Sequence, residues 1–429
     1  MKKIQESKIP TRLHDLLVIL FFFSFIFSIR YVVGLTTTMM AANALLAYRL
    51  DSGKWWNPDF FNLFILGLFL YFTMQAVALL YTWNLSEGIA IFKTNLGMIV
   101  LPVGIQYSNL VNRQSFRRWM RGYLYILISA TVLALVYASI VFYQDHNAKV
   151  FFYHPLVSLY SNHAVQFSVI VFIGLLFLIE EYGRKRYLKS RIQILMLVIY
   201  FSVFLFLLSS KLVITIYFLY ILYLIGFTKI FIAGRVHRIV GLFILLAMMM
   251  AAFIFNTPFS ERIRKEANAR LSVVRQEQFN PGDYFTGVQF RILSWRFVYE
   301  ILNEKHAWIW GVSPGDSQDA LAEKYTRENM FTGGTPENKM GYLGYHSHNQ
   351  FLQAILETGL FGLAFFIIAC GGLIRMAGKS AGGFLWILVF LLLCNCFTDA
   401  PLKTQYGIIL FVFFPLFMYK GTQKGAPED

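Results

Sequence analysis

The chain has 429 residues, of which 57% are hydrophobic and 18% aromatic, and its formal net charge is +15. Apolar runs of membrane length recur along it, which excludes a soluble multidomain protein because too much apolar surface would face water. The positive charge would fit nucleic-acid binding, but Lys and Arg concentrate in short connections between the apolar runs, where a membrane surface accounts for them. We therefore expect an all-α polytopic membrane protein.

The apolar runs predict about twelve transmembrane helices. The first follows a basic N-terminus as a signal peptide would, but no cleavage site follows it, so we expect a retained helix. The seventh and eighth meet at Ser209-Ser210-Lys211 with almost no loop. The approximate bounds are 14–33, 35–48, 59–82, 86–106, 119–143, 159–181, 192–209, 211–228, 236–255, 349–374, 382–398 and 405–420.

The short connections between these helices predict the orientation. Alternate connections are rich in Lys and Arg, whereas the intervening ones carry only Lys149 and Lys403. Basic residues accumulate in cytoplasmic loops, so both termini are expected in the cytoplasm. The chain then divides into helices 1–9 at 1–255, a large external loop at 256–347, and helices 10–12 with a cytoplasmic tail at 348–429.

The large external loop is expected to form a small helical cap on the outer membrane face. Residues 260–278 carry apolar side chains at helical spacing and predict an amphipathic helix. Residues 290–305 and 317–329 predict two more helices, separated by turns that are rich in Gly and Pro.

The stretch from Tyr345 to Gly362 joins this loop to the tenth span. Ser347 as N-cap and Gln350 three residues later predict a capping box, which places His348 in the first turn of a helix. Free N–H groups there favour an anion, and a histidine can move protons near neutral pH. A polar helix start without further function is the alternative. Glu357 lies half a turn away from His348 and is expected to be buried against other helices.

Cations inside apolar runs indicate a binding site on the outer side of the membrane, where the large loop is also expected. Arg30, Lys93 and Lys211 fall in the outer half of their spans, where charges are costly and usually face a cavity or a partner, although Arg30 and Lys93 can also reach the surface by snorkelling. A polyanionic headgroup such as a lipid phosphate or diphosphate would suit such a face. The charged or titratable residues expected on it are Arg30, Lys93, Lys211, Arg291, Arg296, His346 and His348.

Other polar residues give weaker signals. Asp399, near the outer end of the eleventh span, is either a buried acid or a solvated helix end. Cys370, Cys394 and Cys396 all lie in apolar runs, so we expect neither a disulfide framework nor a metal site. The external loop carries no Asp-x-Asp pair for a divalent cation.

At this point the chain resembles the O-antigen ligase family, within the wider group of O-antigen ligases and polymerases (Wzy_C type). One shared pattern runs from His348-Asn349 through Leu352 to Glu357-x-Gly359-x-x-Gly362. A second pattern is a helix start at Arg291 and Trp295, followed by a turn through Gly311, Val312 and Gly315. The third is a charged residue at a helix break before the long loop, here Ser210-Lys211, where the family more often has Arg.

The resemblance implies a GT-C-type glycosyltransferase of the bacterial inner membrane that needs no metal or other cofactor and acts on the periplasmic side. Such enzymes move a glycan from undecaprenyl diphosphate to a hydroxyl of lipid A–core, inverting the anomeric centre. It further implies that His348 is the general base, and that Arg291 and Lys211 hold the diphosphate. His346, Arg296, Arg30 and Lys93 are further candidates, and His346 could take the role of His348.

Other functions remain open at this stage. An O-antigen polymerase shares the donor but uses a second lipid-linked glycan as acceptor. A protein-glycosylating relative would use a Ser or Thr hydroxyl. A transporter of lipid-linked oligosaccharides would need the cations but no general base.

Overall fold

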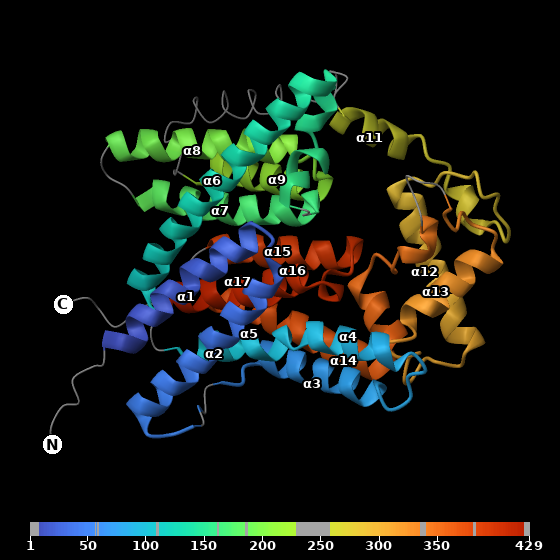
Figure 1. The fold of residues 1–429 in the computed structure, drawn as a ribbon, viewed down its shortest axis with the longest axis horizontal. Coiled ribbons are helices and arrows are strands. Elements are labelled where there is room, and N and C mark those ends of the chain that lie inside the picture. Colours follow the sequence, from blue (N-terminus) through green and yellow to red (C-terminus); the bar gives the residue numbers. More distant parts are fainter. Residues whose placement is uncertain are drawn as a thin grey trace.

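The computed structural model describes residues 8–423 apart from 56, 58–59, 109–110, 161–162, 185–187, 229–257, 335–339 and 381–382. Throughout these residues the regular structure is helical and contains no strand. A large bundle of helices lies beside a smaller lobe, which we define as residues 258–348 (Figure 1).

The bundle contains the helices expected from the apolar runs. Each expected span within the described residues overlaps a helix, and the expected span 236–255 lies outside them. The end of the first expected span, 14–33, is wrong, because one helix ends at Ile26 and the next begins at Arg30. The run 86–106 is divided into two helices at Leu96. The bundle comprises α1 (Lys8–Ile26), α2 (Arg30–Ser52), α3 (Leu63–Ala78), α4 (Leu85–Asn95), α5 (Gly97–Gln106), α6 (Arg113–Asp145), α7 (Ala164–Arg184), α8 (Leu188–Leu207), α9 (Lys211–Phe227), α14 (Gln350–Lys379), α15 (Gly383–Thr398), α16 (Gln405–Ile408), the π-helical η6 (Ile409–Phe413) and α17 (Phe414–Thr422), with the short η1 (Ala148–Phe151), η2 (Pro155–Tyr160) and η5 (Pro401–Lys403) between them.

Length and hydropathy identify membrane-spanning candidates among these helices. Six of the described segments are long and apolar enough to cross a bilayer: α2, Leu85–Gln106, α6, Ala164–Gly183, Ser190–Leu207 and α14. Helices α3, α9 and α15 are apolar but shorter. The chain is thus an all-helical, multi-pass membrane protein, and the total of twelve spans stays a prediction.

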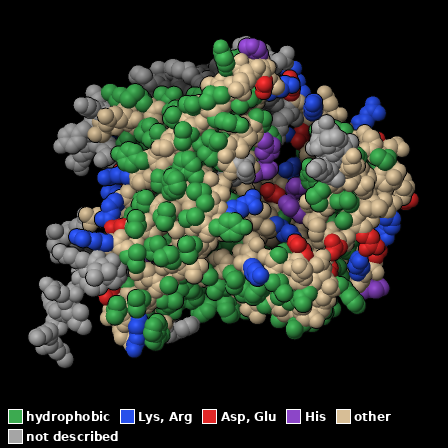
Figure 2. Space-filling view, in the orientation of Figure 1, with side chains coloured by type: hydrophobic (Ala, Val, Ile, Leu, Met, Phe, Trp, Pro, Cys, Tyr) green, Lys and Arg blue, Asp and Glu red, His purple; other side chains and the backbone are tan. Residues whose placement is uncertain are grey.

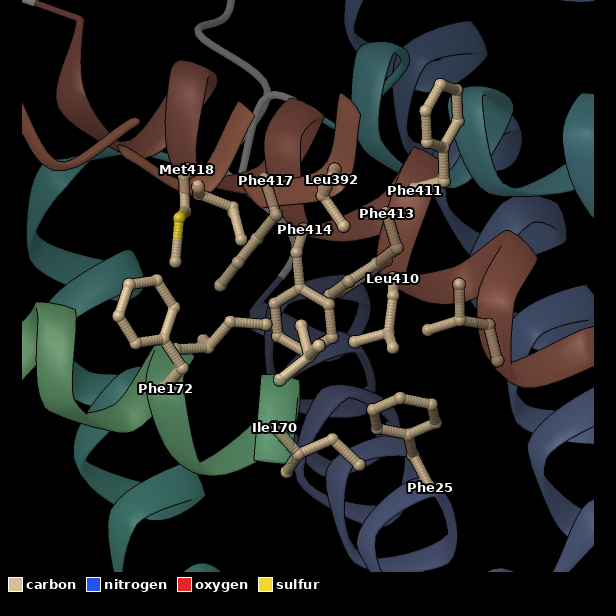
Figure 3. Close-up of a cluster of buried hydrophobic side chains, with 14 of the residues drawn as sticks. Phe25, Ile170, Phe172, Leu392, Leu410, Phe411, Phe413, Phe414, Phe417 and Met418 are labelled. Carbon is tan, nitrogen blue, oxygen red and sulfur yellow. The ribbon is translucent and has the colours of Figure 1, made fainter. Parts of the chain in front are cut away.

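Close helix packing and aromatic side chains hold the bundle together. A Cβ atom on Gly67 of α3 would lie 2.4 Å from the backbone nitrogen of Ala369, and one on Gly372 of α14 would lie 2.2 Å from that of Phe64, so glycines let these two helices touch. The C-terminal run then fills the core between α1 and α7 (Figure 3), with the Phe413 ring 4.6 Å from that of Phe21.

The lobe contains α11 (Pro258–Ala267), η3 (Leu271–Arg275), α12 (Gly287–Glu304), α13 (Ser317–Arg327) and η4 (Gly341–Gly344). The expected helix 260–278 is wrong in its second half, because α11 ends at Ala267. Side chains of α12 bind the backbone carbonyls beyond that point. Arg296 Nη1 donates to Val274 O at 2.8 Å and to Gln276 O at 2.6 Å, and Gln289 Nε2 donates to Arg270 O at 3.0 Å.

The lobe is joined to α14 by backbone hydrogen bonds, and we call this contact the seam. Val312 N donates to Leu356 O at 2.8 Å, Ser313 N to Glu357 O at 3.1 Å, and Leu360 N to Trp308 O at 2.9 Å. These carbonyls and N–H groups are available because α14 is kinked at Gly359, whose φ of 66° and ψ of −163° are not helical. The lobe is therefore fixed directly to a helix of the bundle.

The described ends of the chain lie together, away from the lobe (Figure 1). Near the end of α17, Lys420 Nζ donates to Ile105 O at 2.8 Å, and near the start of α1, Asp15 pairs with Arg118 at 2.6 Å. The start of α1 and the end of α17 therefore lie at the same end of the bundle, as the charge pattern predicts. The side of the membrane that this end faces stays a prediction.

Candidate functional site

A cavity of about 1190 Å³ lies where the bundle meets the lobe. Figure 2 shows the molecule hollowed there, with His, Lys and Arg side chains gathered around the opening. Its walls come from segments that are far apart in sequence: the starts of α2 and α7, the α8–α9 break, α11, α12, the loop before α14 and the segment around η5. Five of the candidate residues line it, namely Arg30, Lys211, Arg291, His346 and His348.

Two histidines and one carboxylate form the most compact group in this cavity. Asp399 Oδ1 lies 3.4 Å from His346 Nε2 and 3.6 Å from His348 Nδ1. His348 N donates to His346 Nδ1 at 3.1 Å, so the two rings are also linked through the backbone. Asp399 is therefore a partner of both histidines and not a solvated helix end. The sequence analysis left open whether Asp399 is a buried acid or a solvated helix end.

The start of α14 differs from the expected capping box. Helix α14 begins at Gln350, and Asn349 is its N-cap, with Oδ1 accepting from Phe351 N at 2.9 Å and Leu352 N at 3.2 Å. Ser347 cannot cap because its hydroxyl donates instead to Gln353 Oε1 at 2.8 Å. His348 consequently lies just before the helix, with a positive φ of 48°. A non-glycine residue in that conformation costs on the order of 1–3 kcal/mol and is typical of functional sites.

The contacts distinguish the roles of the two histidine rings. In His346, Nδ1 accepts the His348 N–H, so the neutral ring carries its proton on Nε2, facing Asp399. In His348, Nδ1 faces Asp399, and Nε2 is buried with no hydrogen-bond partner among the described residues. When Nδ1 of His348 carries the proton and donates it to Asp399, Nε2 keeps its lone pair. Only His348 thus has a nitrogen ready to accept a proton.

The charge state of this group follows from burial and from its mutual contacts. Burial, and then the neighbouring His348, lower the pKa of His346 to about 3, so His346 is neutral at physiological pH. Burial alone would raise the pKa of Asp399, but the hydrogen bond from His348 and the electrostatic interaction with the two imidazole rings hold it well below its usual value. The carboxylate is therefore ionised and can stabilise an imidazolium beside it.

Three cations face the same cavity. Arg291 Nε donates to Thr398 O at 2.7 Å, which places its guanidinium beside Asp399, and Nη1 donates to Gly287 O at 3.0 Å. Lys211 begins α9, directly after the expected break at Ser209 and Ser210, and its ammonium pairs with Glu266 of α11 at 2.6 Å. Arg30 begins α2 and is exposed at the cavity.

The remaining two candidates lie elsewhere. Lys93 is exposed in the last turn of α4 and does not line the cavity. Arg296 points into the lobe, where it pairs with Glu300 at 2.6 Å and binds two backbone carbonyls. Arg296 therefore stabilises the lobe. Both residues were candidates because they were expected on the same side of the membrane as the others. Residues on one side of the membrane need not line the same cavity.

Glu357 is buried, as expected, and anchors a polar network behind the histidines. Its Oε1 accepts from Gln353 Nε2 at 2.8 Å and from Lys403 Nζ at 3.0 Å. Gln353 in turn accepts from the Ser347 hydroxyl, which fixes the loop that carries His346 and His348. The motif from His348 to Gly362 thus combines a histidine that lines the cavity, a buried carboxylate that supports its loop, and the kink of α14 at the seam.

Two cavity residues gave no signal in the sequence. His154, next to η2, and His163, just before α7, line the cavity in the connection between α6 and α7. His154 lies in no apolar run, His163 falls inside the expected span 159–181, and neither belongs to a motif, so the sequence did not single them out.

His346, His348 and Asp399 also satisfy the spacing of a metal site. Each offers one ligand atom, and these three atoms lie within 4.8 Å of one another. Two histidines and a carboxylate are a donor set that divalent transition metals accept. The sequence predicts no metal at these residues.

Together these features define a multi-pass membrane protein with a large cationic cavity that contains a His–Asp group. Residues 190–367 match the model of the Wzy_C family, described as O-Antigen ligase. The match covers less than half of the chain and includes Lys211, Arg291, His346 and His348. It confirms the resemblance drawn from the motifs and implies a function of the O-antigen ligase or polymerase type. No curated protein matches the chain.

Proposed function

We propose that the protein is an O-antigen ligase that transfers a glycan from undecaprenyl diphosphate to a hydroxyl of lipid A–core. The observation that carries this proposal is the single cavity that collects Lys211, Arg291 and His348 from three distant segments. An ionised carboxylate behind a histidine whose second nitrogen is uncommitted suits general-base catalysis. A transporter would use the cations but has no need of such a base.

The proposed reaction follows from these positions. The acceptor hydroxyl gives its proton to Nε2 of His348, and Asp399 stabilises the imidazolium through Nδ1–H. The hydroxyl oxygen forms a bond to the anomeric carbon while the bond from that carbon to the diphosphate breaks, so the centre inverts. The leaving diphosphate gains negative charge, which Arg291, Arg30 and Lys211 stabilise without a metal.

Access to His348 requires a small movement. The rings of Phe290 and Tyr345 both lie 5.6 Å from that of His348, and Nε2 is buried. Tyr345 is exposed at the cavity, whereas Phe290 belongs to the lobe core. We therefore assign Tyr345 as the side chain that an arriving acceptor displaces.

The proposed setting follows the same charge pattern as above. Both termini lie in the cytoplasm, the lobe and the cavity face the periplasm, and the membrane is the bacterial inner membrane. The helix arrangement is of the GT-C type with twelve spans, and the domain bounds are 1–255, 256–347 and 348–429.

The purified protein, supplied with undecaprenyl-diphosphate glycan, tests the proposal. We expect transfer to lipid A–core, read as a glycan-sized mass increase on the acceptor. Elongation of a second lipid-linked glycan, with lipid A–core left unmodified, would identify a polymerase instead. Movement of the lipid across liposomes with no transfer to either acceptor would contradict both and favour a transporter.

Metal removal separates a metal site from a His–Asp pair. We expect excess EDTA to leave the transfer rate unchanged, because the cavity supplies fixed cations for the diphosphate and Asp399 for His348. Rates before and after chelation, and after adding back Mg²⁺, Mn²⁺ or Zn²⁺, give the measurement. Loss of activity that one added metal restores would show that His346, His348 and Asp399 hold an ion.

A further inference from the structure

We propose that the N-terminus of α9, together with the Ser210 hydroxyl beside it, binds a phosphate group of the lipid-linked donor. The inference rests on the proposed function for the identity of the donor. It adds backbone N–H groups and a hydroxyl to the cations that the proposed function already assigns to the diphosphate. Helix α9 has 17 residues, which is long enough to give its N-terminus a positive partial charge.

The first turn of α9 opens on the cavity. Ser210, Lys211, Leu212 and Thr215 all line it. The first N–H groups of a helix have no carbonyl partner within that helix, and a side chain at the N-cap commonly accepts from them. Asn349 does so for α14, but Ser210, the N-cap of α9, makes no such bond. N–H groups at a helix start that faces a cavity suit a phosphate oxygen.

The Ser210 hydroxyl is a second observation that points to a ligand. It is buried and has no hydrogen-bond partner among the described residues, although the residue lines the cavity. Ser210 is only 2% exposed, so this hydroxyl is cut off from bulk water. A buried hydroxyl without a partner costs free energy, which a ligand in the cavity would recover. Rotation about its Cα–Cβ bond breaks no hydrogen bond among the described residues and would turn the hydroxyl towards such a ligand.

The charges around this position give the helix start a role. The ammonium of Lys211 is paired with Glu266 at 2.6 Å, which neutralises much of its charge before a ligand arrives. The first turn of α9 carries no acidic residue, so the partial charge of about +0.5 at the helix N-terminus is not neutralised in the same way. The helix start therefore offers hydrogen bonds and positive charge without a carboxylate that a phosphate would first have to displace.

Replacement of Ser210 by alanine separates binding from stability. With the full-length protein in detergent, we expect Ser210→Ala to weaken binding of undecaprenyl diphosphate about tenfold, the effect of one hydrogen bond to a charged group. Binding of undecaprenol, which has no phosphate, should not change. The variant also loses an unsatisfied buried hydroxyl, so its melting temperature without lipid should be no lower than that of the wild type. A purely structural role for Ser210 would instead lower the melting temperature and leave the preference for the diphosphate unchanged.

Replacement of Ser210 by aspartate tests the N–H groups of the helix. A carboxylate at the N-cap can accept from these groups and is stabilised by the helix dipole, so it would take the place of the phosphate. We expect Ser210→Asp to weaken undecaprenyl diphosphate binding more than about a hundredfold, because it also repels the ligand. Binding of undecaprenol should again stay at the wild-type level, which shows that the cavity remains folded.

Ser209 provides a matched control next to the site. Its hydroxyl donates to Leu207 O at 3.2 Å and the residue does not line the cavity, so Ser209→Ala should bind both lipids like the wild type. Wild-type affinity for undecaprenyl diphosphate in both Ser210 variants, or an equal loss for undecaprenol, would overturn the inference. Inorganic pyrophosphate should bind more weakly than the lipid; equal affinity would assign the site to a free anion and overturn the lipid part of the proposal.

The inference and the proposed function can fail separately. If the wild type transfers glycan while both Ser210 variants bind the diphosphate normally, the proposed function stands and the inference fails. If the Ser210 variants lose diphosphate binding selectively but the wild type transfers glycan to no acceptor, the phosphate site stands and the proposed function fails.

Discussion

Replacement of His348 by asparagine is expected to lower kcat for glycan transfer by about 10²–10⁴-fold, the usual contribution of a general base. Asparagine tolerates the positive φ of this position better than alanine does, so the variant should fold. Affinity for undecaprenyl diphosphate should stay within about twofold, because the cations that we propose to hold the diphosphate are untouched. The measurements are single-turnover transfer and donor binding on the same preparation.

His346→Asn is the matched control, since His346 touches the same carboxylate but has its Nδ1 occupied by a backbone N–H. We expect a loss of less than about tenfold, as for a group that positions Asp399 without accepting a proton. A large loss in His346→Asn together with an active His348→Asn would exchange the two roles. Equal melting temperatures of both variants and the wild type would exclude unfolding as the cause.

Replacement of Gly359 by alanine is expected to give the largest loss of stability. A Cβ atom there would lie 2.0 Å from Ile309 O and 2.6 Å from Trp310 N, both backbone atoms that cannot turn away. The φ of 66° with a ψ of −163° is also essentially restricted to glycine. Strain and overpacking together should cost about 2–5 kcal/mol and loosen the seam.

Gly371→Ala provides the comparison on the same helix. A Cβ atom on Gly371 would meet no atom within 4 Å, so this variant should be as stable as the wild type, or up to about 1 kcal/mol more stable through its helix propensity. Thermal unfolding in detergent, followed by circular dichroism, compares the two. Similar melting temperatures for both variants would show that the seam can shift to accept a side chain at Gly359.

The sequence predicted the helices well because a membrane imposes a strong pattern. Apolar runs located the described bundle helices, and the break before Lys211 was placed correctly. Helix ends were harder, because they depend on tertiary contacts. Ser347 was predicted to be the N-cap, but its hydroxyl donates to Gln353 instead. Residues 268–278 were predicted to be helical, but side chains of α12 bind their backbone carbonyls.

The candidate site was predicted in part, for a related reason. Cations inside apolar runs, together with a motif, identified five residues that line the cavity. The charge pattern alone predicts only the side of the membrane on which a residue lies. It therefore could not predict that Arg291 lines the cavity whereas Arg296 binds within the lobe. The partnership of Asp399 with the histidines depends on how the end of α15 meets the loop before α14. No local spacing reports a contact between residues that lie some fifty positions apart.

The cavity takes its walls from nearly the whole chain, from Arg30 to Tyr406. During synthesis, the ribosome delivers His348 before Asp399 and the segment around η5, a delay on the order of seconds at usual elongation rates. Until that last segment inserts, the histidines lack their carboxylate and the cavity lacks one wall. Under the proposed function, a chain that ends before Asp399 should therefore show no glycan transfer.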